Sequence, residues 1–251
     1  MDATPPRDTP DSTPLLAADD VRKQFGALVV LDGVELSVGA GEAVGIVGPN
    51  GAGKTTLLDV LAGAQRPNAG TVRFRGDDVT RMNAAGRCTL GVGRTHQIPR
   101  PFADMTVFEN VLVGTTTGGG LRGQEAYDRA LAVLDSTGLM PVANRRAAAL
   151  GLLSRKRLEM ARALATGPVV LLLDEIAGGL TEDESHELVA SIQELRRGGL
   201  AIVWIEHVVQ ALVQVAERLV CMSAGRIIAD GTPDEVMRHP AVIEAYLGSA
   251  A

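Results

Sequence analysis

The sequence predicts an α/β fold built on a mostly parallel β-sheet. Short β-type runs alternate with helical patterns along the chain, as in proteins whose parallel strands are joined by crossover helices. The runs at 169–173 and 201–205 are apolar at every position, which is typical of central strands covered on both faces. A glycine-rich loop lies between the apolar run 43–47 and a helical pattern at 54–62, an order typical of such sheets.

These patterns give each element a place in the chain. Strands are expected at 34–38, 43–47, 71–74, 90–94, 169–173, 201–205, 218–222 and 226–230. Helices are expected at 54–62, 125–137, 155–166, 183–197 and 207–217. From about residue 100 to 165 helical patterns replace the β pattern, with a glycine-rich break at 115–120, so we expect a helical subdomain there.

Length and composition predict the domain organisation. Residues 1–14 carry four prolines among Asp, Thr and Ser, and are predicted to form a disordered tail. The remaining residues, 15–251, could form one large α/β domain or two small ones. We expect a single domain into which the helical subdomain is inserted.

Composition also argues against several classes of protein. The longest apolar runs, such as 169–173, are far shorter than the roughly 20 residues that cross a bilayer. A formal net charge of −6 argues against binding to nucleic acid, whose phosphates require a basic protein face. Cys88 and Cys221 lack metal-ligand spacing and no signal peptide precedes them, so we expect free thiols in a reducing cytosol.

The glycine-rich loop fits the pattern G-x-x-x-x-G-K-[ST] of a phosphate-binding loop, which indicates a nucleoside triphosphate site. Its glycines allow successive backbone N–H groups to approach phosphate oxygens, and the following helix directs its positive end at them. Lys54 is expected to bridge the β- and γ-phosphates, and the Thr55 hydroxyl to ligate Mg²⁺. The residues expected to bind ATP are Gly48, Pro49, Asn50, Gly51, Ala52, Gly53, Lys54, Thr55 and Thr56.

Two carboxylates end the apolar run 171–173. Asp174 is expected to hold Mg²⁺, and Glu175 to polarise the water that attacks the γ-phosphate. A strand-end Asp-Glu pair is usually structural or solvated when it stands alone, but here it follows a phosphate-binding loop.

The apolar run 201–205 ends in Glu206-His207, at the sheet edge where ligands bind in open α/β sheets. His207 is therefore expected to reach the γ-phosphate as a hydrogen-bond donor. Gln97 lies between the two nucleotide motifs, and its amide oxygen is a candidate Mg²⁺ ligand. The other histidines are interpreted as caps or surface groups: His96, His186 and His239.

From about Leu15 onward, this ordered set of motifs resembles the ATP-binding cassette (ABC) family, the nucleotide-hydrolysing subunits of ABC transporters. The resemblance implies a mostly parallel core sheet, an antiparallel β subdomain and a helical subdomain, and it assigns Phe25 as the platform for adenine. Several stretches are similar to the subgroup that serves importers of branched-chain amino acids and related amides. They are residues 94–97, 105–110, 157–162, 205–207 and 239–248.

The chain departs from the family in the signature motif, a Leu-Ser-Gly-Gly-Gln-like segment that contacts the γ-phosphate held by a partner cassette. The aligned residues are Leu150, Gly151, Leu152, Leu153 and Ser154, so the Ser and the closely approaching Gly are both replaced. We expect a heterodimer with two unequal sites; the alternative is a working variant whose N–H groups still reach the phosphate. Ile176 replaces a common Pro, and Thr181 a common Asp or Asn.

The resemblance also implies partners and a location. It predicts a second cassette, transmembrane permease subunits and, indirectly, an extracytoplasmic solute-binding protein, with the chain peripheral on the inner face of the membrane. Arg100, Pro101, Phe102 and Met105 are the candidate permease contacts, or else they cover the subdomain core. The alternatives are a soluble cassette acting in DNA repair or translation, and a regulatory cassette with little turnover. The transported solute cannot be assigned from these residues.

Overall fold

The computed structural model describes residues 13–247 and contains two sheets. The larger sheet has the order β10-β9-β3-β8-β7-β6, in which β6, β7, β8, β3 and β9 run parallel and β10 pairs antiparallel to β9. Its strands are β3 (Ala43–Val47), β6 (Val92–Arg94), β7 (Val170–Asp174), β8 (Ala201–Ile205), β9 (Arg218–Ser223) and β10 (Arg226–Gly231). The two wholly apolar runs form β7 and β8, which lie inside the sheet as predicted.

The smaller sheet is antiparallel, with the order β2-β1-β4-β5. Its strands are β1 (Leu16–Phe25), β2 (Leu28–Val38), β4 (Ala69–Phe74) and β5 (Asp77–Asp78). The sequence patterns missed β1 and the first half of β2. The register of β1 shifts between Ala18 and Val21, and Asp20 has a φ of 46°, so a bulge interrupts the alternation of buried and exposed residues.

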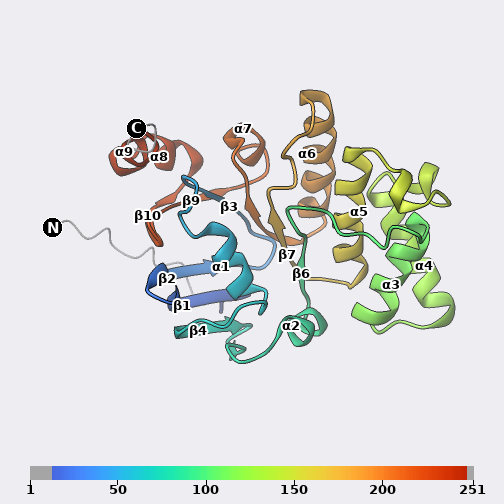
Figure 1. The fold of residues 1–251 in the computed structure, drawn as a ribbon, viewed down its shortest axis with the longest axis horizontal. Coiled ribbons are helices and arrows are strands. Elements are labelled where there is room, and N and C mark those ends of the chain that lie inside the picture. The colour runs from blue at the N-terminus through green and yellow to red at the C-terminus, as the bar shows by residue number, and fades with distance from the viewer. Residues whose placement is uncertain (1–12, 248–251) are drawn as a thin grey trace.

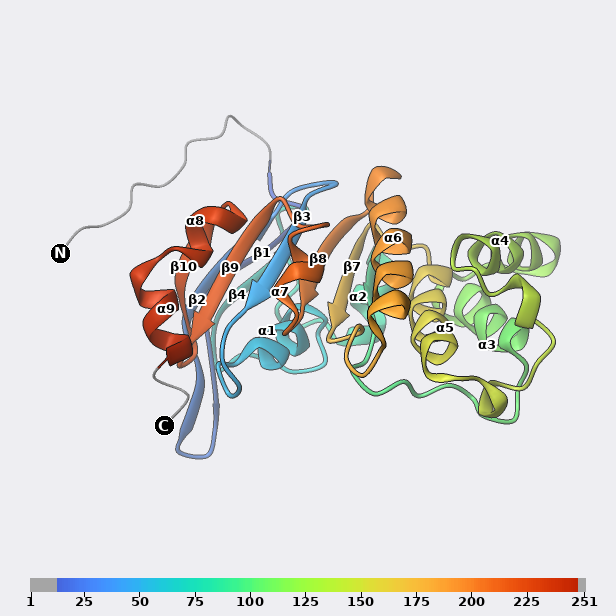
Figure 2. The ribbon, with the colours of Figure 1, turned by 90° about the horizontal axis from the view of Figure 1, so that it is seen from above.

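The helices surround the larger sheet and form a separate layer at one end of the molecule. They are α1 (Lys54–Leu61), α2 (Ala84–Leu90), α3 (Val107–Val113), α4 (Gly123–Ser136), α5 (Leu152–Ala165), α6 (Glu182–Arg197), α7 (Val209–Leu212), α8 (Pro233–Met237) and α9 (Pro240–Leu247). Figure 1 shows α3, α4 and α5 grouped at the end opposite β1, β2 and β4. Seen from above, α8 and α9 lie beside β10 at the other end (Figure 2).

Three sequence predictions about element boundaries are wrong. Leu90 ends helix α2 rather than starting a strand, because Gly91 adopts a left-handed φ of 108° that separates the helix from β6. The break expected at 115–120 begins as a π-helical turn, Gly114–Gly118, that continues α3. The helix expected at 207–217 is the short α7 (Val209–Leu212), and the Glu217 N–H instead donates to the carbonyl of Ala43, the first residue of β3.

Two hydrophobic cores lie on opposite faces of the larger sheet. Leu171 and Leu173 of β7 face a core shared with α3 to α7, whereas Val170 and Leu172 face a core shared with α1 and the antiparallel sheet. This alternation of neighbouring residues explains why the strand is apolar at every position.

In residues 13–247, no helix is both long and apolar enough to span a membrane. The disorder predicted for residues 1–14 falls almost wholly outside the described residues, and the division into a tail and one domain stays a prediction.

Candidate functional site

The phosphate-binding loop connects the end of β3 to the start of α1. Gly48 has a φ of 142°, and a Cβ atom there would overlap the carbonyl oxygen of Met222 on β9. Gly53 has a φ of 98°, and its Cβ would come within 2.6 Å of the Val30 carbonyl oxygen on β2. The loop is thus pressed between two strands by contacts that only glycine allows at these positions.

Lys54 folds over this loop. Its side chain is buried, and Nζ donates to the carbonyl oxygens of Gly48 at 2.7 Å and Pro49 at 3.0 Å. Burial lowers the pKa of Lys54, and the nearby Glu175 and Asp174 carboxylates partly oppose that effect. Asn50, Gly51 and Thr55 are exposed, whereas Ala52 and Gly53 are buried.

Asp174 lies at the end of β7, beside the start of α1, and is almost fully buried. Its Oδ1 accepts a hydrogen bond from the Thr55 hydroxyl at 3.3 Å, and its Oδ2 lies 3.5 Å from Nη2 of Arg94. Burial raises the pKa of Asp174, against the opposing effect of Arg94. The Thr55 hydroxyl and the Asp174 carboxylate supply the hard oxygen ligands that Mg²⁺ prefers. A bound cation would also offset the cost of burying the negative charge of Asp174, so this pair of residues fits Mg²⁺.

Glu175 follows Asp174, and its carboxylate contacts two of the other predicted site residues. Oε1 lies 2.8 Å from Nε2 of His207, and Oε2 accepts a hydrogen bond from Nε2 of Gln97. Because a carboxylate oxygen accepts, Nε2 of His207 carries the proton in this pair. The structure therefore brings together the side chains that follow β6, β7 and β8.

Phe25 lies at the end of β1, and its ring is exposed. The Lys23 ammonium lies 4.9 Å from the centroid of this ring and also donates to the Arg66 carbonyl at 2.8 Å. The ring therefore lies at the end of an inner strand of the antiparallel sheet, with one ammonium group beside it.

The segment aligned with the signature motif forms the start of α5. Gly151 is the N-cap, is exposed, and has open space where a Cβ would project. Leu152 is exposed, and a Cβ atom at Gly179 would lie 3.4 Å from its Cδ2; Leu153 packs against the core, and Ser154 is partly buried. No side chain caps this helix end, at which Gly151 and Leu152 are both exposed.

The two other departures from the family pattern have structural roles here. Ile176 is fully buried in the core. Thr181 caps α6: its hydroxyl accepts from the Glu184 N–H at 3.3 Å, and the Glu184 carboxylate accepts from the Thr181 N–H at 3.0 Å. Thr181 is therefore a helix cap in this chain.

The sequence analysis missed several residues that contact the site. Arg94 forms ion pairs with Asp59 and Asp174, Tyr246 of α9 accepts a hydrogen bond from the Gly48 N–H at 2.9 Å, and Lys156 and Glu206 are buried beneath Glu175. Glu206 could have been recognised as a site residue because it is a charged residue directly after an apolar strand. Tyr246 is about 200 residues from the loop it contacts, and no local pattern marks it.

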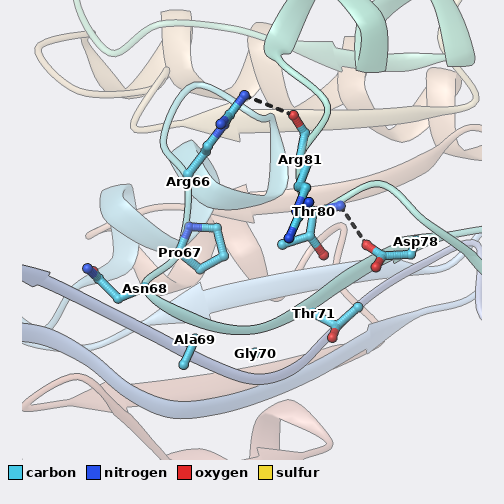
Figure 3. A pocket seen from close by; sticks show the side chains of 9 residues that line it. All are labelled: Arg66, Pro67, Asn68, Ala69, Gly70, Thr71, Asp78, Thr80 and Arg81. Atoms are coloured by element: carbon cyan, nitrogen blue, oxygen red, sulfur yellow. Dashed lines mark hydrogen bonds between the residues drawn. The ribbon is translucent and has the colours of Figure 1, made fainter.

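A separate hollow of about 390 Å³ lies in the antiparallel part of the molecule (Figure 3). Its lining comes from residues 66–71 and from Asp78, Thr80 and Arg81. Arg66 donates to the Arg81 carbonyl, and the Asp78 carboxylate accepts from the Thr80 N–H. These groups already bind one another, and the nucleotide motifs lie on other segments of the chain.

Comparisons with known proteins identify the family of the chain. Residues 31–178 match the family model "ABC transporter", and residues 226–251 match "Branched-chain amino acid ATP-binding cassette transporter". The chain is 39% identical to the high-affinity branched-chain amino acid transport ATP-binding protein LivG of Salmonella typhimurium, over 95% of this chain and 100% of that protein. It is 35% identical to BraF of Pseudomonas aeruginosa, which carries the same description, with the same coverage.

A solved structure, the ADP conformation of an ATP-binding cassette of an ABC transporter, superimposes with a TM-score of 0.86 and 31% identity. The match covers 94% of this chain and 100% of that one. The chain therefore belongs to the ABC transporter family and is one of its ATP-hydrolysing cassettes.

Proposed function

We propose that this chain is the ATPase subunit of an importer for branched-chain amino acids or related amides. Both relatives named above carry branched-chain amino acid transport in their names and are covered along their whole length. The match of residues 226–251 to the branched-chain amino acid family model is independent support from the C-terminal part of the chain.

In the proposed mechanism the Lys54 ammonium binds the β- and γ-phosphates, and Thr55 and Asp174 would hold Mg²⁺. When bound, the ion supplies positive charge to the phosphates. Glu175 orients and polarises the attacking water, and His207 donates a hydrogen bond to the γ-phosphate. The observation that carries this assignment is the Glu175 carboxylate, held between His207 and Gln97 at the end of β7.

The same observation indicates a step before hydrolysis. Both oxygens of Glu175 are occupied, one by His207 and the other by Gln97. Nε2 of His207 carries a single proton, so it must leave Glu175 before it can donate to the γ-phosphate. We propose that binding of ATP moves His207 from Glu175 to the γ-phosphate.

Replacing Glu175 by Gln in the assembled transporter tests the catalytic role. Turnover should fall by about 100-fold or more, because the amide is not a base, while binding of Mg·ATP is retained. Glu217→Gln is the matched control, since Glu217 is exposed and pairs with Arg196 at the surface. Wild-type turnover in the Glu175 variant would remove Glu175 from the catalytic role.

We further propose that the partner cassette is a different chain. Leu152 stands at the exposed N-terminus of α5, where the family uses small or polar residues against a phosphate held by the partner. The native mass of the purified transporter tests this proposal. One copy of this chain for each pair of cassettes is expected, and two copies would refute the heterodimer.

The permease contact is proposed to lie at Arg100, Pro101, Phe102 and Met105, on the inner face of the membrane, in a transporter that also uses an extracytoplasmic binding protein. Phe102 supports the site, since its ring is exposed and lies 5.0 Å from the Arg162 guanidinium of α5. Phe102→Ala should weaken co-purification with the permease, whereas Leu28→Ala, at an exposed position on β2, should not. Equal recovery of the permease with both variants would contradict this contact.

A further inference from the structure

The turn that carries Glu175 is held in an unfavourable backbone conformation. Glu175 has a φ of 47°, in the left-handed region that non-glycine residues rarely adopt, at a cost of about 1–3 kcal/mol. Such a conformation persists when surrounding contacts fix it. The Glu175 N–H donates to the Ile205 carbonyl at 2.9 Å, and two buried charged side chains provide further contacts.

Lys156 is the first of these charges. It lies on α5 with 5% of its surface exposed, and its Nζ donates to the carbonyl oxygens of Gln97 at 3.1 Å and Glu175 at 3.2 Å. One ammonium group from the helical layer thus holds the backbone of two site residues. Burial lowers the pKa of Lys156, and the Glu206 and Glu175 carboxylates oppose that shift.

Glu206 is the second charge, at the end of β8, with 2% of its surface exposed. Its Oε1 accepts from the Ala177 N–H at 2.6 Å, and its Oε2 accepts from the His207 N–H at 3.2 Å. Glu206 therefore joins the far end of the Glu175 turn to the backbone of His207. Burial raises the pKa of Glu206, whereas the hydrogen bonds from the Ala177 and His207 N–H groups and the Lys156 charge oppose that rise.

The partners of Lys156 and Glu206 favour a role in hydrolysis over a purely structural one. Many buried side chains bind main-chain groups, so the informative point is which main-chain groups these two side chains reach. Here all four bonds end on the main chain of Gln97, Glu175, Ala177 and His207, which directs the side chains of the proposed catalytic group.

Helix α5 also contacts the segment that follows Gln97, at Arg100. Glu159 and Arg162 lie one and two helical turns beyond Lys156 on the same helix. The Glu159 carboxylate accepts from the Arg100 N–H at 3.3 Å, and Arg162 donates to the Arg100 carbonyl at 2.8 Å. The helix that holds the Glu175 carbonyl therefore also holds residues 97–100.

We propose that Lys156 and Glu206 are positioning residues that couple the placement of α5 and of the Gln97 segment to the backbone of Glu175 and His207. This inference rests on the proposed roles of Glu175 and His207 in hydrolysis. Loss of either charge leaves the nucleotide site in place and displaces the Glu175 carboxylate from its working position.

The test measures ATP turnover and Mg·ATP affinity separately in the assembled transporter. Lys156→Met and Glu206→Gln should each lower kcat by about 10- to 100-fold and change the nucleotide Kd by less than about threefold. Lys156→Arg should recover most of the turnover, because a guanidinium can still donate to both carbonyls. Arg129→Met and Glu217→Gln, which change exposed charges, are the controls.

Two results would overturn the proposal. In the first, Lys156→Met and Glu206→Gln lower the free energy of unfolding but keep kcat within threefold of the controls. In the second, kcat and nucleotide affinity fall together, and Lys156→Arg does not recover turnover. Glu175→Gln in the same assay separates the hypotheses: if it abolishes turnover while Lys156→Met and Glu206→Gln do not, this inference alone fails.

Discussion

Arg87 of α2 is fully buried, and its replacement by Met should destabilise the protein without touching the nucleotide. Nη1 donates to the Val60 and Leu61 carbonyls at 2.7 and 2.8 Å, and Nη2 to those of Val79 and Thr80 at 2.8 and 3.3 Å. The guanidinium therefore caps the C-terminal end of α1, the helix whose other end carries the phosphate-binding loop. Burial lowers the pKa of Arg87 to about 10, which still leaves it charged at neutral pH.

The magnitude follows from the carbonyl groups that Met would leave behind. The Val60 carbonyl also accepts from Gly63, and the Val79 carbonyl from Met82. For the other two carbonyls, Leu61 and Thr80, Arg87 is the hydrogen-bond donor. An orphaned buried acceptor costs about 1–3 kcal/mol, so the two carbonyls left by Arg87→Met should lower the free energy of unfolding by about 2–6 kcal/mol.

Urea unfolding of the nucleotide-free chain measures this loss for Arg87→Met, with Arg81→Met as the control. Arg81 is an exposed arginine six residues away, and its replacement should change stability by less than about 0.5 kcal/mol. A saturating concentration of Mg·ATP, about 100 times its Kd, should stabilise wild type and both variants equally, by about 2.7 kcal/mol. If Arg87→Met were within 1 kcal/mol of wild type, the hydrogen bonds of Arg87 would not cap α1 as argued.

Three further predictions use the same measurement. Gly48→Ala should destabilise the chain far more than Gly51→Ala, because a Cβ atom at Gly48 would overlap the Met222 carbonyl oxygen. The space at Gly51 is open, so Gly51→Ala should cost only the strain of its left-handed φ, about 1–2 kcal/mol. Similar losses for the two variants would contradict the packing of the loop. Thr181→Ala should cost about 0.5–2 kcal/mol through loss of the α6 cap, and a neutral result would mean that the cap is dispensable. Burial raises the pKa of Glu206 above its ordinary value of 4.5, so between the two pKa values the folded state binds more protons than the unfolded state. The free energy of unfolding should therefore fall as pH rises from 4.5 through the raised pKa. Glu206→Gln should flatten that part of the pH profile of stability, and an unchanged profile would refute the shift.

The sequence predicts the location of the site well, because the site lies where buried strands end. Parallel strands bring their carboxyl ends to one edge of a sheet, so the residues that follow β3, β7 and β8 must be neighbours. The pairing of Asp174 with Ile205 and of Ile46 with Ile205 makes this concrete. Each of these strands could be recognised from its own apolar run, and the polar residues directly after that run were then the candidates for the site.

The sequence predicts less well wherever a residue is fixed by a distant contact. The bulge at Asp20 interrupts the alternating pattern by which a strand is recognised in a sequence, so β1 was not predicted. The bulge follows from the pairing of β1 with β2 and β4, whose registers both shift there. Arg87 is the one buried residue of α2, and it is buried because four carbonyl groups from other segments accept its hydrogen bonds. The periodicity of the sequence around Arg87 gives no indication of those distant carbonyl groups.

The same distinction explains why the catalytic candidates were recognisable and the residues that support them were not. Glu175 and His207 are expected from motif and strand end alone, but their geometry depends on Lys156 and Glu206, which contact main-chain atoms. A backbone carbonyl or N–H is identical at every position, so a side chain that binds one leaves no matching residue type in the sequence. Residues of this kind have to be identified from their burial and their hydrogen bonds. Lys156 and Glu206 are of this kind beside the Glu175 turn, and Arg87 is of this kind at the end of α1.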